Sequence, residues 1–180
     1  MQETQKDSNL DIDVFEDEDE DTQKDKFLTF RLENEDYGIQ IRHITEIIVM
    51  QDITPIPDMP EFIIGLINLR GQIISIMDVR RRFGLKSKEY DDRTCIIVVN
   101  IDAISVGLVV DTVNEVINIP ESVIDPPPRG HSDIESSYIL GLAKVGKKVK
   151  VLVDIERILQ DEDMNKIASL SEENQGTEAE

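Results

Sequence analysis

An internal repeat limits the fold of this chain more than any other feature of its sequence. Residues 38–48 recur 69 positions later and residues 65–79 recur 76 positions later, and the seven-residue difference falls in a longer connector with three prolines at 126–128. The matched pairs are Gly38/Gly107, Ile41/Val110, Ile44/Val113, Glu46/Glu115, Ile47/Val116, Ile48/Ile117, Gly65/Gly141, Leu66/Leu142, Ile73/Val149, Ile76/Leu152, Asp78/Asp154 and Val79/Ile155. Because the pattern of apolar residues and glycines is kept, the chain is predicted to fold one module twice.

Short strands separated by turns are predicted throughout both repeats. Leu28, Phe30 and Leu32 alternate with polar residues, which is typical of a half-buried strand, and a turn is expected over Asn34–Asp36. The predicted strands cover residues 27–32, 39–41, 62–70, 72–77, 95–101, 105–110, 138–145 and 149–153. The last is expected to bury its valines and expose its lysines. Many short strands at this spacing favour small barrels or a sandwich.

Few helices are expected. Asp78 and Asp154 end strands at repeat-equivalent positions, and each is suited to cap a short helix. The spacing of Ile44, Ile47 and Ile48 predicts a single helical turn. A further short helix over 164–170 is an option for the C-terminal segment.

The hairpin tip at 68–71 differs between the repeats. Asn68, Arg70 and Gly71 lie at the tip of an apolar ribbon, where Gly71 suits a turn that requires a positive φ. The second repeat has Lys144, Gly146 and Lys147 at the same place. This asymmetry favours the first tip as a contact site, although an ordinary hairpin with a solvated arginine remains the alternative.

The strong negative charge belongs to the two ends of the chain. Residues 1–26 carry net −8 and residues 160–180 carry net −6, so only −5 of the total of −19 belongs to residues 27–159. Six consecutive acidic residues, 16–21, favour a disordered tail. Such a tail repels nucleic acid, and no basic stripe offsets it, so nucleic acid is not expected as a partner.

Compartment signals indicate a cytoplasmic protein that is not inserted in a membrane. The N-terminus lacks the pattern of a signal peptide, and no apolar run approaches 18 residues. Cys95 is the only cysteine and lies in an apolar strand, so it is expected to be a small buried side chain without a disulfide.

The sequence points away from an enzyme, a cofactor and a metal site. Only two histidines are present: His131 is in a polar loop beside Ser132 and Asp133, where a contiguous triad is geometrically implausible, and His43 is expected to be a packing residue. Metal-ligand spacings and glycine-rich phosphate loops are both missing from the sequence. A small β-domain enzyme is kept as the rival class.

The stretch G-L-I-N-L-R-G-Q-I-I-S-I-M-D-V-R, residues 65–80, resembles the signature GxxNxRGxxxPVxDLR of the CheW family of bacterial chemotaxis coupling proteins. Ser75 departs from the usual proline and Met77 from a branched residue. The resemblance extends over about residues 26–160. The further matching segments are Tyr37-Gly38-Ile39, Glu46-Ile47, Pro55 and Pro57, Val109-Val110-Asp111 with Val113, and Leu140-Gly141-Leu142.

This resemblance implies a mainly β fold of two five-stranded SH3-like barrels, related by internal duplication, with short helices. It implies a CheW-like domain over 26–160 with intertwined repeats at 27–84 and 94–160. The acidic N-terminal tail over 1–25 and the acidic C-terminal tail over 161–180, both indicated by the charge distribution, lie outside this domain. The implied function is non-catalytic coupling of chemoreceptor tips to the regulatory domain of the histidine kinase CheA. A paralogue that binds only one of the two partners is the alternative; a CheV-like protein would need room for a receiver domain.

The resemblance also assigns candidate receptor-binding residues. Arg70 matches the family's receptor-contact arginine, with Asn68 beside it on a polar rim, and Glu46 is expected to hold Arg70 through an ion pair. Ile44, Ile47 and Ile48 are expected to form an apolar floor for a helical receptor tip. Plain core packing for the isoleucines, and a solvated helix face for Glu46, stay open.

Overall fold

A computed structural model describes residues 23–127 and 138–159 of the chain. Most of the predicted N-terminal tail, the loop with His131, and the whole C-terminal segment with its optional helix lie outside the described residues. The described ranges contain nearly all of both repeats.

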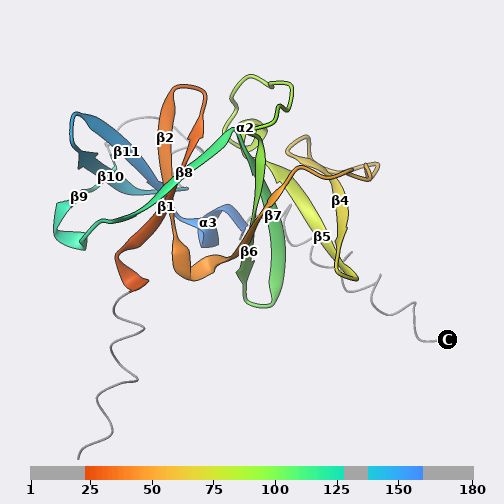
Figure 1. Cartoon of the computed structure of the whole chain (residues 1–180), viewed down its shortest axis with the longest axis horizontal. Coiled ribbons are helices and arrows are strands. Elements are labelled where there is room, and N and C mark those ends of the chain that lie inside the picture. Colours follow the sequence, from red (N-terminus) through yellow and green to blue (C-terminus); the bar gives the residue numbers. More distant parts are fainter. Residues whose placement is uncertain (1–22, 128–137, 160–180) are drawn as a thin grey trace, which may run out of the picture.

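The strands and short α-helices of the two repeats follow the same order, except that β9 has no strand equivalent in the first repeat (Figure 1). The 3-10 turns are placed differently, since η1 lies before β3 and η2 lies after β8. The first repeat consists of β1 (Lys26–Leu32), β2 (Glu35–Gln40), the 3-10 turn η1 (Ile41–His43), β3 (Ile44–Val49), β4 (Ile63–Leu69), β5 (Gln72–Asp78) and α2 (Val79–Arg82). The second consists of β6 (Cys95–Ile101), β7 (Ile104–Val110), β8 (Thr112–Asn118), η2 (Glu121–Val123), β9 (Ile124–Asp125), β10 (Ile139–Val145), β11 (Lys148–Val153) and α3 (Ile155–Leu159). The mainly β class with short helices is confirmed.

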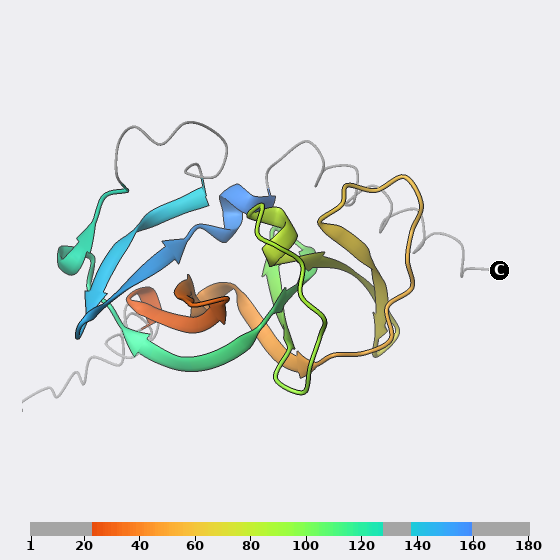
Figure 2. The same cartoon turned by 90° about the horizontal axis from the view of Figure 1, so that it is seen from above.

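Each sheet takes strands from both repeats. The five-stranded sheet has the order β3-β6-β7-β5-β4, and the six-stranded sheet has the order β8-β1-β2-β11-β10-β9. In each sheet a strand pair of one repeat lies beside the hairpin of the other repeat, and the two strands that meet there are parallel. These are β5 with β7 in the five-stranded sheet and β11 with β2 in the six-stranded sheet. Figure 2 shows the two sheets curling side by side, so the duplicated modules are exchanged across the molecule. The short β9 provides a sixth strand beyond the five expected.

Three apolar clusters fill the fold. The largest lies between the sheets and contains residues of both repeats, among them Leu28, Phe30, Met77, Leu108 and Ile158. The second fills the five-stranded sheet and the third, much smaller, fills the six-stranded sheet. Because the shared cluster joins both sheets and both short helices, neither repeat can bury its apolar residues alone.

Glycine at the repeat-equivalent positions 65 and 141 allows a connector to cross each hairpin closely. A Cβ atom on Gly65, where φ is +150°, would lie 2.3 Å from the carbonyl oxygen of Thr54. A Cβ atom on Gly141 would lie 2.7 Å from the carbonyl oxygen of Asp125. Both distances are shorter than van der Waals contact, so a side chain at either position would displace the connector.

The predicted helix caps and turns are largely confirmed. The carboxylate of Asp78 accepts hydrogen bonds from the backbone N–H groups of Arg80 and Arg81 at the start of α2. Asp154 accepts one from the N–H of Arg157 in α3 at 3.3 Å. The first turn lies one to two residues earlier than expected, because β2 already begins at Glu35.

Three predictions made from the spacing of apolar residues are wrong, each because residues distant in the sequence pack against the segment. Residues 44–49 form strand β3, not a helical turn, because they pair with β6. Strand β1 is covered on both faces, with Thr29 fully buried, because Leu28 and Phe30 pack in the cluster shared by the two sheets while Phe27 packs in the smaller cluster of the six-stranded sheet. In β11, Lys150 is buried and Val149 is exposed, because Lys150 meets Asp36 of β2.

Candidate functional site

The tip of the β4–β5 hairpin is a two-residue turn that presents Arg70. Leu69 pairs with Gln72, and the two residues between them, Arg70 and Gly71, have φ of 51° and 85°. Two successive positive φ angles define a type I′ turn, which matches the twist of the flanking strands. The side-chain oxygen of Asn68 accepts a hydrogen bond from the N–H of Gly71 at 2.8 Å, which supports the turn. Asn68 therefore shapes the tip and lies beside Arg70.

The predicted ion pair between Glu46 and Arg70 is confirmed. A guanidinium nitrogen of Arg70 bonds to a carboxylate oxygen of Glu46, although the two residues lie on β3 and at the end of β4, the two outer strands of the five-stranded sheet. This contact shows that the sheet curls until its edges approach each other. The Arg70 side chain remains 72% exposed while that of Glu46 is 28% exposed. The guanidinium is thus oriented but open to a partner.

The three isoleucines of the predicted apolar floor do not share one surface. Ile47 is 44% exposed, whereas Ile48 packs on the core of the five-stranded sheet and Ile44 packs on the shared core. Strand alternation explains the difference, because neighbouring side chains of β3 point to opposite faces. Only Ile47 is strongly exposed among the three.

Two further exposed apolar residues were missed by the sequence reasoning. Val49 on β3 is 74% exposed and Val116 on β8 is 53% exposed. β3 and β8 are outer strands of their sheets and lie on the same side of the molecule (Figures 1 and 2). Val116 is the repeat equivalent of Ile47, so the repeat itself carried a signal for this pair. Exposed aliphatic side chains on two such strands form an apolar surface suited to a protein partner.

Arg80, ten residues after Arg70, is buried and structural. Its side chain is 9% exposed; Nε donates to Asp111 at 2.7 Å, and one Nη donates to the carbonyl of Lys86 at 2.8 Å and to Glu33 at 3.3 Å. Burial alone raises the pKa of Asp111, but hydrogen bonds from Arg80 and from the Glu33 N–H outweigh it and leave that pKa below its ordinary value. The sequence analysis included Arg80 only as the last residue of the stretch 65–80 and gave it no partner, because nothing local shows that Asp111 lies beside it.

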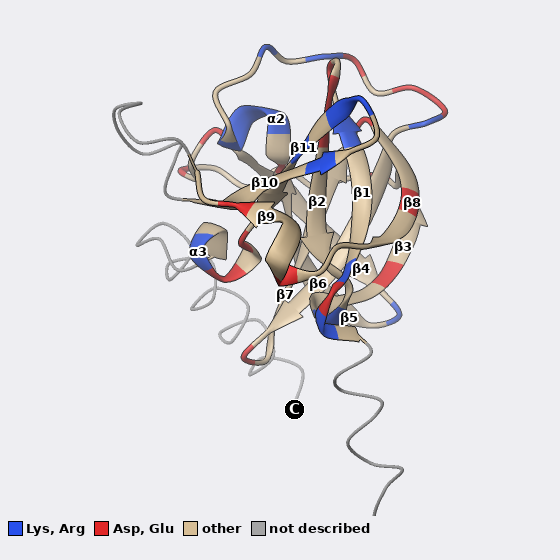
Figure 3. Ribbon diagram, turned by 90° about the vertical axis from the view of Figure 1, so that its left-hand side faces the viewer, with Lys and Arg blue, Asp and Glu red and all other residues tan. Residues whose placement is uncertain are grey.

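A second buried charge cluster fills one end of the six-stranded sheet. Asp36 accepts from Arg31 at 3.1 Å and from Lys150 at 3.4 Å, and both Asp36 and Lys150 are buried. Burial raises the pKa of Asp36, yet the bonds and charges of these two cations together hold it below its ordinary value. In Figure 3 the free end of β10 and β11 is blue, so the cluster continues into an exposed basic tip.

Across residues 23–127 and 138–159, no three acidic, histidine or cysteine side chains are grouped as metal ligands. Within the same residues no helix has the length and apolarity to cross a membrane. Cys95 is free and packs against the shared core, as expected, but it is only partly buried, with its Sγ 3.1 Å from the carbonyl oxygen of Arg93.

Comparison with known proteins agrees with this geometry. Residues 26–163 match the family model described as a CheW-like domain. The chain is 40% identical over 139 residues to "Chemotaxis protein CheW" of Klebsiella aerogenes, covering 77% of this chain and 84% of that protein. It is 30% identical over 149 residues to the protein of the same name from Treponema pallidum, covering 81% and 88%.

A solved structure is similar in fold as well as in sequence. The scaffolding protein TtCheW from Thermoanaerobacter tengcongensis superposes with a TM-score of 0.70 at 37% identity, over 77% of this chain and 90% of that protein. The duplicated two-sheet architecture is therefore shared with an experimentally determined structure.

Proposed function

Because this chain belongs to the CheW family, whose members are non-catalytic scaffold adaptors of chemotaxis, we propose that it couples chemoreceptor tips to the histidine kinase CheA. On this proposal it acts in the cytoplasm and is recruited to membrane-associated receptor arrays. It needs no cofactor, since its work is to hold two partners in a fixed relation.

The observation that carries the proposal is the oriented arginine at the β4–β5 tip. Glu46 holds Arg70, which leaves most of the guanidinium exposed for hydrogen bonds to a receptor. A guanidinium fixed in advance loses little conformational freedom on binding. Asn68 completes the polar rim, and Ile47 offers an exposed apolar contact beside it, while Ile44 and Ile48 support the strand from below.

A helical receptor tip suits the surface formed by these residues. An amphipathic helix binds through an apolar stripe bordered by polar groups. The exposed side chains of Ile47 and Val49 on β3 and Val116 on β8 can meet such a stripe, with Arg70 at its polar border. The kinase regulatory domain, which is homologous to this family, is proposed to meet the exposed ends of the sheets. A paralogue that binds only kinase or only receptors is the second candidate.

The test is titration of the purified chain with a receptor-tip fragment and, separately, with the kinase regulatory domain. Arg70→Ala should weaken receptor binding by about 1–3 kcal/mol, the range for loss of a charged interface group. Because Arg70 is 72% exposed, the free energy of unfolding should change by no more than about 0.5 kcal/mol. Arg93→Ala, at an exposed arginine of the loop before β6, is the matched control.

Different outcomes separate the candidates. Binding of both partners, with only the receptor arm weakened by Arg70→Ala, supports the coupling function. Binding of one partner alone supports the specialised paralogue. Receptor affinity that is the same in Arg70→Ala and Arg93→Ala contradicts the role given to the tip.

A further inference from the structure

The tip of the β10–β11 hairpin is an exposed patch of lysines and valines. Val145 and Val149 are 36% and 47% exposed. Lys144, Lys147 and Lys148 lie around the two valines and are all exposed, which makes this end of the hairpin basic in Figure 3. We call these five residues the lysine tip. A basic surface of this kind stands out in a chain whose net charge is −19.

The three lysines of the tip have no counter-charge within the part of the chain that the structure describes. Over residues 23–127 and 138–159, none of them takes part in an ion pair. The buried neighbour Lys150, by contrast, is paired with Asp36, and the exposed Arg70 is paired with Glu46. Unpaired cations beside bare valines favour a partner that carries acidic and aliphatic side chains together.

The N-terminal segment of the same chain has this complementary composition. Residues 10–15 read L-D-I-D-V-F, so aliphatic and acidic side chains alternate before the phenylalanine. Six consecutive acidic residues follow at 16–21, and residues 1–26 carry net −8. Residues 10–21 can therefore offer apolar groups to the valines and carboxylates to the lysines.

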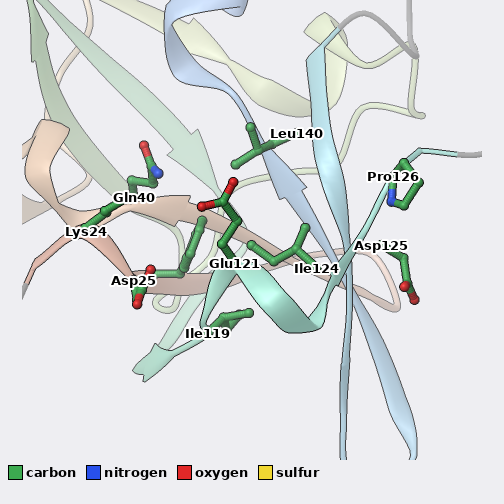
Figure 4. A pocket seen from close by; sticks show the side chains of 10 residues that line it. Lys24, Asp25, Gln40, Ile119, Glu121, Ile124, Asp125, Pro126 and Leu140 are labelled. Atoms are coloured by element: carbon green, nitrogen blue, oxygen red, sulfur yellow. The ribbon is translucent and has the colours of Figure 1, made fainter.

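The place where this segment joins the domain does not attract it. Lys24 and Asp25, just before β1, line a pocket at one end of the six-stranded sheet (Figure 4). Glu121 and Asp125 line the same pocket, and Lys24 is the only cation in its lining. Because like charges repel, the carboxylates at 16–21 are not stabilised there and favour a basic surface further away.

The lysine tip lies at the other end of the same sheet and within reach. Phe27 pairs with Gln40 at the end where the chain enters, and Lys150 pairs with Asp36 at the opposite end. A strand of seven residues such as β1 spans about 20–23 Å. Residues 14–23, when extended, span about 30 Å, so residues 10–14 can reach the tip of their own molecule.

We propose that residues 10–21 dock on the lysine tip of the same molecule, with Leu10, Ile12 and Val14 against the valines and the acidic residues against the lysines. A short tether gives an effective concentration of the order of millimolar, so an intrinsic dissociation constant of about 1 mM leaves about half of the tips covered. A partner with an acidic surface must displace the segment before it binds the tip, so the contact is autoinhibitory. Its test needs neither receptor nor kinase.

Paramagnetic relaxation in the isotope-labelled full chain tests the proposal. A nitroxide is attached at Ser8→Cys, beside the docking segment, in a chain whose single native thiol is removed by Cys95→Ala. At an ionic strength of about 0.01 M the amide signals of residues 146–147 should be lost, and they should return at about 1 M, where charges are screened. The amides of residues 102–103, at the exposed turn between β6 and β7, should keep their signals throughout. Dispersed amide signals show at the same time that the chain is folded.

Two sets of substitutions separate charge pairing from chance proximity. Lys144→Gln with Lys147→Gln and Lys148→Gln should restore the signals of the tip at low salt, because the carboxylates lose their partners. Lys86→Gln with Arg93→Gln, at two exposed cations of the loop before β6, is the matched control and should leave the signals lost.

A mixed sample shows whether the segment belongs to the same molecule. Nitroxide-labelled chain without isotope is added to isotope-labelled chain without nitroxide, and the signals of residues 146–147 should keep their full intensity. Loss of signal in this mixture overturns the proposal, because the tip would then bind another copy. Signals that persist beside the nitroxide at low salt, that disappear together with those of residues 102–103, or that stay lost in the lysine variant overturn it as well.

Discussion

Replacement of Arg80 by methionine should destabilise the fold far more than the same change at Arg81. Methionine keeps much of the apolar stem of Arg80 but removes its hydrogen bonds to Asp111, to Glu33 and to the carbonyl of Lys86. The Asp111 carboxylate, whose side chain is 14% exposed, would keep only the Glu33 N–H at 2.9 Å. A buried charge is left without its counterion.

The expected loss is about 3–5 kcal/mol in the free energy of unfolding, the range for removing one partner of a buried ion pair. Arg81 is 42% exposed and pairs with Asp78 at 3.7 Å, so Arg81→Met should cost no more than about 1 kcal/mol. Native stabilities are typically about 5–15 kcal/mol, so the change at Arg80 removes a large share of the total.

The stability difference between wild type and Arg80→Met depends on pH because the pKa of Asp111 is shifted in the folded state. In the folded wild type this pKa lies below the reference value of 3.8, so the ion pair stabilises the fold at pH above about 4 and its contribution is lost as pH falls through the folded pKa. The difference between wild type and Arg80→Met should therefore shrink in acid.

Urea unfolding at pH 7 and at pH 3, followed by circular dichroism, measures these differences. Arg80→Met combined with Asp111→Leu should regain much of the loss, because replacing both charges leaves no unpaired buried group. A cost for Arg80→Met below about 1 kcal/mol, or equal to that of Arg81→Met, would refute the buried-pair argument.

Two further predictions concern the pH response and backbone packing. Burial and the charge of Arg42 lower the pKa of His43 from 6.5, so the free energy of unfolding should fall as pH drops below 6.5. His43→Gln should make the free energy of unfolding less dependent on pH in urea titrations between about pH 5 and 8. An unchanged pH dependence in this variant contradicts the prediction. Gly65→Ala should lower the free energy of unfolding by about 3 kcal/mol, measured by thermal or urea unfolding, since its Cβ would lie 2.3 Å from a backbone oxygen. Gly71→Ala, with open space around it, should lower it by only about 1 kcal/mol. Equal losses in the two variants contradict this prediction.

Much of the fold could be predicted from local signals. The Asp78 cap, the turn at Arg70–Gly71 and the eight predicted strand segments depend on a few neighbouring residues and are present in the structure, although Ile41 lies in η1 and not in β2. Strands β3, β8 and β9 were not predicted as strands. The Glu46–Arg70 pair was predictable only through the family resemblance, because 24 residues separate the two in the chain. The Ile44 segment was mistaken for a helical turn because three apolar residues at that spacing fit either a short strand or a helix.

The pattern of the sequence by itself determined that one β module occurs twice, with matched strands, glycines and caps, and that a single tip carries an arginine. Which repeat supplies each strand of a sheet was decided only by tertiary structure, because the pairing of β5 with β7 and of β11 with β2 joins residues far apart in the chain. The burial of Arg80 beside Asp111 and of Lys150 beside Asp36 results from that exchange. An arginine or lysine is stable inside a protein only where the fold brings a carboxylate to it, and no local pattern shows which carboxylate that is.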